Sequence, residues 1–237
     1  MVVSAGRNPN SSTHDLEADL RTAVGGEVRF DAVTRQIYSN DASIYQMEPI
    51  GVVIPRDSGD VQATIEICNK NGVAVLPRGG GTGLSGQTVN HAVVIDFSKY
   101  MTNVLEINTE EKWVQTQTGI TIDALNNQLR PTGLFFTPDP STASRANVGG
   151  AMGNNSCGTH SLIYGLTVDH VLEMDLTLSD GSQTTAGCQQ GGALKSRLAL
   201  SGLEGDIYRG VSEISTRSAA LVEAKFPKIQ RRVGGYN

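Results

Sequence analysis

The chain is 237 residues long, enough for one large domain or two small ones, and it is 38% hydrophobic with 27 glycines, which is typical of a globular chain with long glycine-bearing loops. Its formal net charge of −5 argues against the basic surface of a nucleic-acid-binding protein. No apolar run approaches the ~20 residues that span a bilayer, and the polar N-terminus lacks a signal-peptide stretch. We therefore expect a cytoplasmic protein with no transmembrane segment.

In chain order, residues 1–15 are expected to be disordered or extended, and residues 15–25 are expected to form a first helix. Asp15 is the expected N-cap of this helix, and Gly25 lies past its end.

A strand–helix–strand unit is predicted next. The apolar stretches 51–55 and 73–77 indicate short buried strands, and residues 60–72 carry apolar side chains at helical spacing. Either Asp57 or Ser58 would cap this helix, and Gly72 would close it.

The second half of the chain predicts alternating hairpins and helices. Thr121 is a capping residue, and the Asp-Gly pair at 180–181 is a turn signal. The expected elements are a strand at 92–96, a hairpin at 103–119, a helix at 121–133, a strand–turn–strand at 168–187 and a helix at 202–226.

The glycine-rich run PRGGGTGLSGQT follows the strand at 73–77 directly. Gly81 to Gly86 match the dinucleotide pattern G-x-G-x-x-G, and a shifted reading differs from a P-loop in carrying Gln87 where the lysine belongs. Both motifs must open a helix, but only five residues separate Gly86 from the next strand, which is less than two helical turns. The context therefore argues against both motifs.

The same run can bind anionic oxygens without a helix. Its glycines let backbone N–H groups converge on one point, and Arg78 and Thr82 would add a charge and a hydroxyl donor. The expected chemistry is pyrophosphate binding, and a merely flexible turn is the alternative.

The three cysteines do not predict a metal site. Cys68, Cys157 and Cys188 are far apart and match no metal-ligand spacing. Cys68 lies on the apolar side of a predicted helix, so we expect it in the core.

Three ordered motifs carry a resemblance to a known family. They are VVIPRDSGDVQATIEICNKNGVAVLPRGGGTGLSGQ, PDPSTASRANVGGAMGNNSCGTH and YGLTVDHVLEMDLTLSDG. Together they cover about residues 41–182, and they resemble the FAD-binding domain of the vanillyl-alcohol oxidase and p-cresol methylhydroxylase type. Within that type the chain is similar to the FAD-linked D-2-hydroxy-acid dehydrogenases and the glycolate oxidase FAD subunit.

This resemblance implies a set of FAD-binding residues. Those expected at the pyrophosphate are Arg78, Gly79, Gly80, Gly81, Thr82, Gly83 and Leu84. Those expected beside the pyrophosphate and flavin are Pro138, Asp139, Ser141 and Thr142, with a small-residue turn at Val148, Gly149 and Gly150. Those expected near the flavin ring are Asn155, Ser156 and Gly158, and those toward the adenine are Gly165 and Val171.

Some residues depart from the family pattern or stay ambiguous. Thr82 stands where covalent members often carry a histidine, which implies noncovalent FAD. Cys157 replaces a usual glycine and is either a thiol near the flavin or a tolerated small residue. His160 either assists binding or is structural, His170 has no predicted role, and Trp113 is expected in the core.

The resemblance implies an α+β fold of two subdomains, 16–98 and 99–215, with FAD in the groove between them and the second built on a largely antiparallel or mixed sheet. Residues 216–237 would be a helical extension toward an absent cap or substrate domain. The implied activity is oxidation of a D-2-hydroxy acid of the lactate, glycolate or 2-hydroxyglutarate class, by hydride transfer to flavin N5.

The same resemblance indicates what this chain lacks. The family's G-S-E-G-T-L-like segment is not found, and the catalytic base and carboxylate-binding arginines are expected in the absent region, so no catalytic residue is assigned. An iron–sulfur domain or subunit is one possible partner, with peripheral membrane association through a partner. The alternatives are a cofactor-poor scaffold or assembly subunit, a Rossmann dehydrogenase, and a relative that reduces a nucleotide-sugar enol ether.

Overall fold

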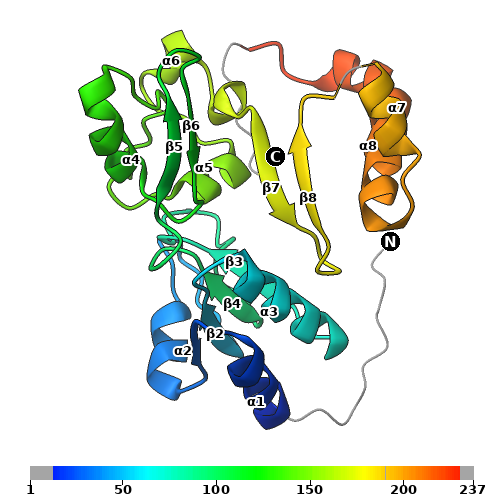
Figure 1. Ribbon diagram of the computed structural model, residues 1–237. Helices are drawn as coiled ribbons and strands as arrows, with labels where there is room; N and C mark the ends of the chain where they lie inside the picture. The colour runs from blue at the N-terminus through cyan, green and yellow to red at the C-terminus, as the bar shows by residue number, and fades with distance from the viewer. Residues whose placement is uncertain (1–12, 190, 230–237) are drawn as a thin grey trace.

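The computed structural model describes residues 13–189 and 191–229, and the lower half in Figure 1 is built on a four-stranded sheet. In spatial order the strands are β1 (Glu27–Arg29), β2 (Gly51–Ile54), β4 (Val93–Asp96) and β3 (Val75–Arg78). β4 runs parallel to both neighbours, whereas β1 is antiparallel to β2. Every residue of β2 and β4 is buried, because helices cover the sheet, and both strands are apolar except for Asp96 at the end of β4.

Helices on the two faces of this sheet complete its core. They are α1 (Thr13–Ala23), α2 (Ala32–Tyr38) and α3 (Ser58–Lys70). Leu20 of α1 and Cys68 of α3 are fully buried in one cluster with Val53 and Val93 of the sheet. The predicted core position of Cys68 is thus confirmed. Tyr38, at the end of α2, packs on the cluster that contains Val52 and Val94.

The helix boundaries correct one prediction and decide another. α1 begins at Thr13, so Asp15 lies in its first turn and is not the N-cap. An acidic side chain there still suits the positive end of the helix dipole. At α3 the cap is Asp57, whose carboxylate accepts a hydrogen bond from the Asp60 N–H at 3.0 Å. Gly72, with φ of +64°, follows the end of that helix as expected.

The upper half in Figure 1 contains short elements in the order hairpin, helices, hairpin. They are β5 (Val104–Asn108), β6 (Trp113–Thr116), α4 (Ile122–Leu129), the 3₁₀ turn η1 (Arg130–Thr132), α5 (Val148–Asn154), α6 (Ser161–Tyr164), the 3₁₀ turn η2 (Thr167–His170), β7 (Glu173–Thr177) and β8 (Gln183–Gly187). Ile120, Leu125, Leu129 and Val148 form its core cluster.

Two predictions about this half were wrong. Among the described residues, β5–β6 and β7–β8 are separate two-stranded antiparallel sheets and do not form the single sheet that was expected. Turn signals specify pairing within a hairpin, whereas pairing between hairpins depends on distant contacts. Trp113 is half-buried and not in the core, because it lies beside the hairpin loop and its Nε1–H donates to Glu111 at 2.7 Å.

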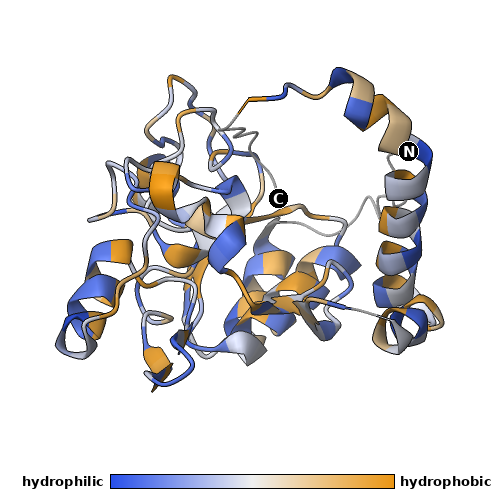
Figure 2. Ribbon diagram, turned by 90° about the horizontal axis from the view of Figure 1, so that it is seen from above, coloured by the Kyte–Doolittle hydropathy of each residue, from blue (hydrophilic) through white to orange (hydrophobic). Residues whose placement is uncertain are grey.

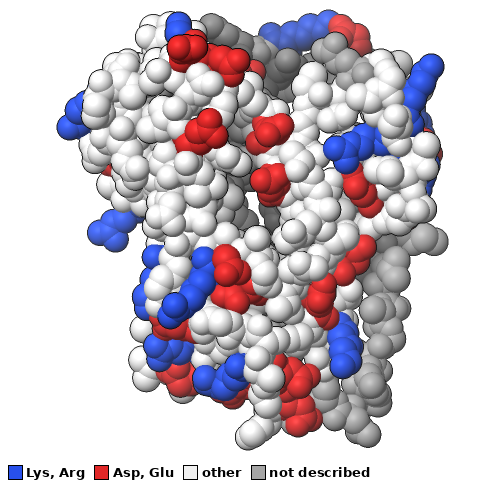
Figure 3. Space-filling view, viewed as in Figure 1, with Lys and Arg blue, Asp and Glu red and all other residues white. Residues whose placement is uncertain are grey.

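The chain continues into α7 (Gly192–Leu198) and the 24-residue α8 (Gly202–Lys225), which lies at the edge of the molecule in both Figure 1 and Figure 2. Only Gly205 is buried in α8. The exposed apolar side chains of α8 include Ile207, Val211, Ile214 and Leu221, which are 42–62% exposed. No helix in the described ranges is long and apolar enough to cross a membrane. On the face drawn in Figure 3, positive and negative side chains are interspersed.

Candidate cofactor-binding site

The glycine loop begins at the end of β3 and reaches β4 without forming a helix. The dinucleotide motif and the P-loop both need a helix directly after the glycines, so this observation confirms the reason for rejecting them. Gly81 has a φ of +63°, a backbone conformation that glycine adopts without strain. Across the described residues, no acceptor contacts the backbone N–H groups of Gly81, Thr82, Gly83 or Leu84. Four successive N–H donors are thus available to an anion.

Arg78 does not offer a free charge to that anion. One guanidinium nitrogen donates to the carbonyls of Tyr38 and Thr88, both at 3.0 Å, and the other donates to the Asn40 carbonyl at 2.6 Å. The group also lies 5.2 Å from the centre of the Tyr38 ring. Burial lowers the pKa of Arg78, and the negative charge of Asp41 opposes that shift. The Arg78 side chain therefore holds the start of the glycine loop in place, and the backbone N–H groups remain as the donors available to an anion.

Asn147 joins the glycine loop to the upper half of the molecule, and the sequence analysis missed it. The side chain is 4% exposed; its Oδ1 accepts from the Gly80 N–H at 2.6 Å, and its Nδ2 donates to the Gly119 carbonyl. A Cβ on Gly79 would collide with the Asn147 amide, and one on Gly80 would collide with the Arg145 carbonyl. The position of Asn147 directly before a small-residue run was a usable N-cap signal.

Residues 148–150 form the start of helix α5, whereas the sequence predicted a turn. Val148 and Ala151 are buried, while Gly150 and Gly153, three residues apart, lie on an exposed face. A Cβ on Gly150 or Gly153 would meet no atom within 4 Å. Glycine in a helix costs ~1 kcal/mol relative to alanine, so packing within the described chain does not account for these two residues. An open cradle of this kind fits the close approach of a cofactor.

A second contact brings α5 and the glycine loop together. Gln87, which disqualified the P-loop reading, donates from Nε2 to the Asn154 Oδ1 at 3.1 Å and accepts from the Ser85 N–H at 3.2 Å. Together with Asn147, it ties the loop to both ends of α5. The free N–H groups and the glycine face of α5 therefore belong to one region of the molecule.

Asn155 and Ser156 have mainly bracing contacts. Asn155 takes a left-handed conformation, with φ of +48°, and its Oδ1 accepts from the Val168 N–H at 3.0 Å. The Ser156 carbonyl accepts from both the N–H and the hydroxyl of Thr167, at 3.2 and 2.7 Å. These bonds hold η2 against the end of α5. Val171 follows η2 and is half-buried.

The remaining predicted residues form a second group. Pro138 is buried, Asp139 is half-buried, and Ser141 and Thr142 lie in the turn that leads to Asn147. Gly158 packs so closely on Asp139 that a Cβ there would collide with the Asp139 carbonyl. Gly165 has a φ of +90° and ends α6.

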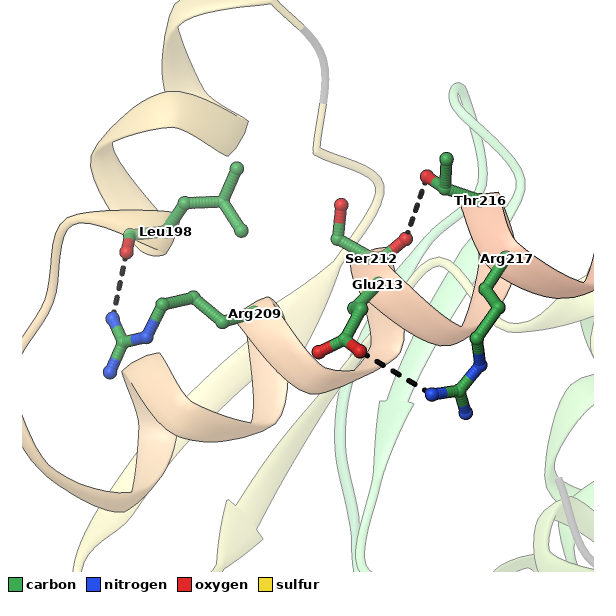
Figure 4. A pocket seen from close by; sticks show the side chains of 6 residues that line it. All are labelled: Leu198, Arg209, Ser212, Glu213, Thr216 and Arg217. Atoms are coloured by element: carbon green, nitrogen blue, oxygen red, sulfur yellow. Dashed lines mark hydrogen bonds and ion pairs between the residues drawn. The ribbon is translucent and has the colours of Figure 1, made fainter.

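A separate hollow of about 550 Å³ lies on α7 and α8, away from these residues (Figure 4). Its lining residues are Leu198, Arg209, Ser212, Glu213, Thr216 and Arg217. Arg209 donates to the Leu198 carbonyl at 2.8 Å, and Arg217 pairs with Glu213 at 3.4 Å. Its cations are thus already paired with the protein's own oxygens. The described residues contain no group of His, Cys, Asp and Glu side chains that could hold a metal ion.

Comparison with known proteins identifies the class. The FAD binding domain family matches residues 49–187, more than half of the chain, and the chain belongs to this family. It is 40% identical over 225 residues to the D-2-hydroxyglutarate dehydrogenase of Pseudomonas putida, covering 94% of this chain and 22% of that protein. It is 35% identical over 181 residues to the glycolate oxidase subunit GlcD of Bacillus subtilis, covering 74% of this chain and 38% of that protein.

Solved structures agree on the fold. Alkyldihydroxyacetonephosphate synthase aligns with a TM-score of 0.68 at 21% identity, over 79% of this chain and 37% of that one. p-Cresol methylhydroxylase aligns with a TM-score of 0.65 at 17% identity, over 73% of this chain and 35% of that one. The predicted α+β FAD-binding fold of the p-cresol methylhydroxylase type is therefore confirmed. The chain spans about a fifth of the length of the D-2-hydroxyglutarate dehydrogenases that it matches.

Proposed function

We propose that this chain is the cofactor-binding part of an oxidoreductase that oxidises a D-2-hydroxy acid of the lactate, glycolate or 2-hydroxyglutarate class. The row of four free N–H groups from Gly81 to Leu84, tied through Asn147 and Gln87 to the glycine face of α5, carries the proposal. FAD bound there would supply a flavin N5 that accepts hydride. The substrate class rests on the names of the relatives.

The protein residues divide into those that would contact FAD and those that position them. Backbone N–H groups of Gly81 to Leu84 would bind the pyrophosphate, while Gly79 and Gly80 would let the loop pack against Asn147 and Arg145. Gly150 would let the cofactor approach α5, and Gly149 would let the helix pack against Thr118. Residues 155–158 would lie near the flavin ring, with Gly165 and Val171 toward the adenine. Arg78 and Asn147 would hold the loop in position without contacting FAD. Thr82 cannot form a covalent bond to the flavin, which supports noncovalent FAD.

The domain boundaries and the partner belong to the same proposal. We assign residues 16–98 and 99–215 to the two subdomains, with FAD between them, and assign the substrate pocket to a domain beyond residue 237. The exposed apolar side chains of α8 support the proposal that a further polypeptide covers this helix. The electron acceptor would be an iron–sulfur domain or subunit, a quinone or oxygen, and the location would be cytoplasmic.

The first test is a titration of the purified chain with FAD, followed by absorption spectroscopy and acid precipitation. We expect flavin bands that saturate and flavin that is released into the acid supernatant. Flavin that stays with the precipitate would contradict noncovalent binding. Anaerobic addition of D-2-hydroxyglutarate, glycolate or D-lactate should bleach the flavin only when the polypeptide extends past residue 237; bleaching by the 237-residue chain would contradict the assigned location of the substrate pocket.

A cofactor-poor scaffold is the second candidate, and the engaged Arg78 favours it, because no free cationic side chain of this loop faces a pyrophosphate. A longer form of the protein that retains no flavin at any concentration would support the scaffold and overturn the oxidoreductase.

A further inference from the structure

Two segments that lie about twenty residues apart meet in what we call the histidine junction, residues 135–139 against residues 158–170. Each segment contains candidate cofactor residues, Asp139 in the first and Gly158 in the second. His160 and His170 both bridge the segments. Sequence reasoning left His160 ambiguous and gave His170 no role, so the junction comes from the tertiary structure.

Asp139 is the anchor for the first histidine. Its Oδ1 accepts from the His160 backbone N–H at 3.0 Å, and its Oδ2 lies 2.6 Å from the His160 Nδ1. Because a carboxylate only accepts, Nδ1 carries a proton in this contact. Partial burial tends to raise the pKa of Asp139, but the hydrogen bonds and charge of His160 outweigh it, and the net shift is downward. The absence of a side chain on Gly158 lets the two backbones approach.

The second histidine closes the other end of the junction. His170 Nε2 lies 2.8 Å from the Thr137 Oγ1 and 2.8 Å from the Tyr164 carbonyl. A carbonyl only accepts, so Nε2 carries the proton. Aromatic rings add two edge-on contacts. The ring centres of Phe135 and Tyr164 lie 6.1 Å apart, and those of Phe136 and His170 lie 6.0 Å apart.

Polar contacts hold this junction, since little of it is buried. The side chains of His160 and Asp139 are 56% and 34% exposed, and Phe135 and Tyr164 are 50% and 47% exposed. Phe136 of the first segment packs on core clusters of the upper half, and Thr167 of the second segment is fully buried. Among the described residues, however, no buried apolar cluster contains residues of both segments. The backbone bond from the His160 N–H to Asp139 and the close approach of Gly158 to Asp139 also join the two segments, and the imidazole contacts add to them. The relative position of the segments therefore depends in part on the imidazoles.

We propose that His160 and His170 are positioning residues that hold segments 135–139 and 158–170 in the arrangement that FAD requires. The inference rests on the proposed function for its ligand, and on the junction's own contacts for its geometry. Asp139 and Thr137 act through these histidines and need not touch the cofactor.

The experiment compares variants that keep or remove each bridging nitrogen. Asparagine places its amide where Nδ1 lies, and glutamine places it where Nε2 lies, so His160→Asn and His170→Gln preserve the bridges while His160→Ala and His170→Ala remove them. His91→Ala is the control, since His91 contacts the Glu48 carbonyl outside the junction. All are made in the 237-residue chain.

Hydrogen exchange without FAD is the first readout. Backbone amides of residues 160–165 should exchange several-fold faster in the alanine variants and near the wild-type rate in His160→Asn, His170→Gln and His91→Ala. Wild-type exchange rates in both alanine variants would overturn the proposal. The exchange measurement needs no FAD, so it tests the junction even if the chain binds no FAD. Absent FAD binding would count only against the proposed function.

FAD affinity and the visible absorption band of the bound flavin are the second readout. Loss of a hydrogen bond to a charged group predicts a Kd about tenfold higher in His160→Ala, with a changed band shape, and recovery of both in His160→Asn. If His160→Asn binds FAD as weakly as His160→Ala but exchanges its amides at the wild-type rate, His160 contacts FAD directly through Nε2. That outcome would overturn the positioning role.

Discussion

At the residue scale, buried Asn147 decides where the glycine loop lies, because it bonds Gly80 with one amide atom and Gly119 with the other. Asn147→Ala should lower the free energy of unfolding by about 1–3 kcal/mol, because the buried Gly119 carbonyl and the Gly80 N–H lose their partner, and should weaken FAD binding. Urea unfolding and FAD titration measure the two effects. Asn127→Ala is the control, since Asn127 is exposed; an equal loss in both variants would refute the specific role of Asn147.

The glycine loop also changes how its own mutants must be interpreted. The sequence predicts that a bulky residue at Gly80 or Gly81 abolishes FAD binding and leaves the fold intact. In the structure, a side chain at Gly80 would collide with the Arg145 carbonyl, and one at Gly81 would meet the Arg78 guanidinium, so either would displace the loop. Lost binding in such a variant would therefore not separate contact with FAD from misfolding.

At the element scale, α5 carries two glycines on an open face that the chain itself does not fill. Gly150→Ala and Gly153→Ala should each stabilise the FAD-free chain by about 0.5–1 kcal/mol, because alanine is the better helix former, while lowering FAD affinity. Urea unfolding without FAD and a flavin titration test this pair of opposite effects.

Gly210 offers a matched control for that experiment. It lies inside α8, and a Cβ there meets no atom within 4 Å. Gly210→Ala should give the same gain in stability with unchanged flavin affinity. If Gly150→Ala behaves like Gly210→Ala in both measurements, α5 does not line the cofactor site.

At the scale of the whole molecule, one ion cluster links the first strand to the turn after β4 and makes stability depend on pH. Hydrogen bonds from Lys99, Tyr100 and Arg29 lower the pKa of Glu27 to about 2. A lowered folded-state pKa means that the carboxylate stabilises the fold above about pH 4.5 and that this contribution is lost as the pH falls toward 2. Glu27→Gln should flatten that acid loss in urea unfolding, whereas exposed Glu110→Gln should not.

The exposed face of α8 is the second property at this scale. Val211, Ile214 and Leu221 are 62%, 54% and 62% exposed, and large exposed apolar surfaces bind apolar dyes. Serine at all three positions should reduce the fluorescence of anilinonaphthalene sulfonate on the chain and leave FAD affinity unchanged. Undiminished fluorescence would place the dye-binding surface elsewhere.

The sequence by itself determined the family and several of the local elements, though not helix α5. Apolar runs specified β2 and β4, Asp57 and Gly72 bounded α3, and the five residues after Gly86 ruled out a helix, because each of these depends on neighbours along the chain. Only the tertiary structure decided what Arg78, Asn147, His160 and His170 contact, since the hydrogen-bond partners of these side chains are 10 to 67 residues away, except for Tyr164, which lies six residues before His170. Hydrogen bonds over such separations form only when packing brings the segments together, and no local pattern records that packing.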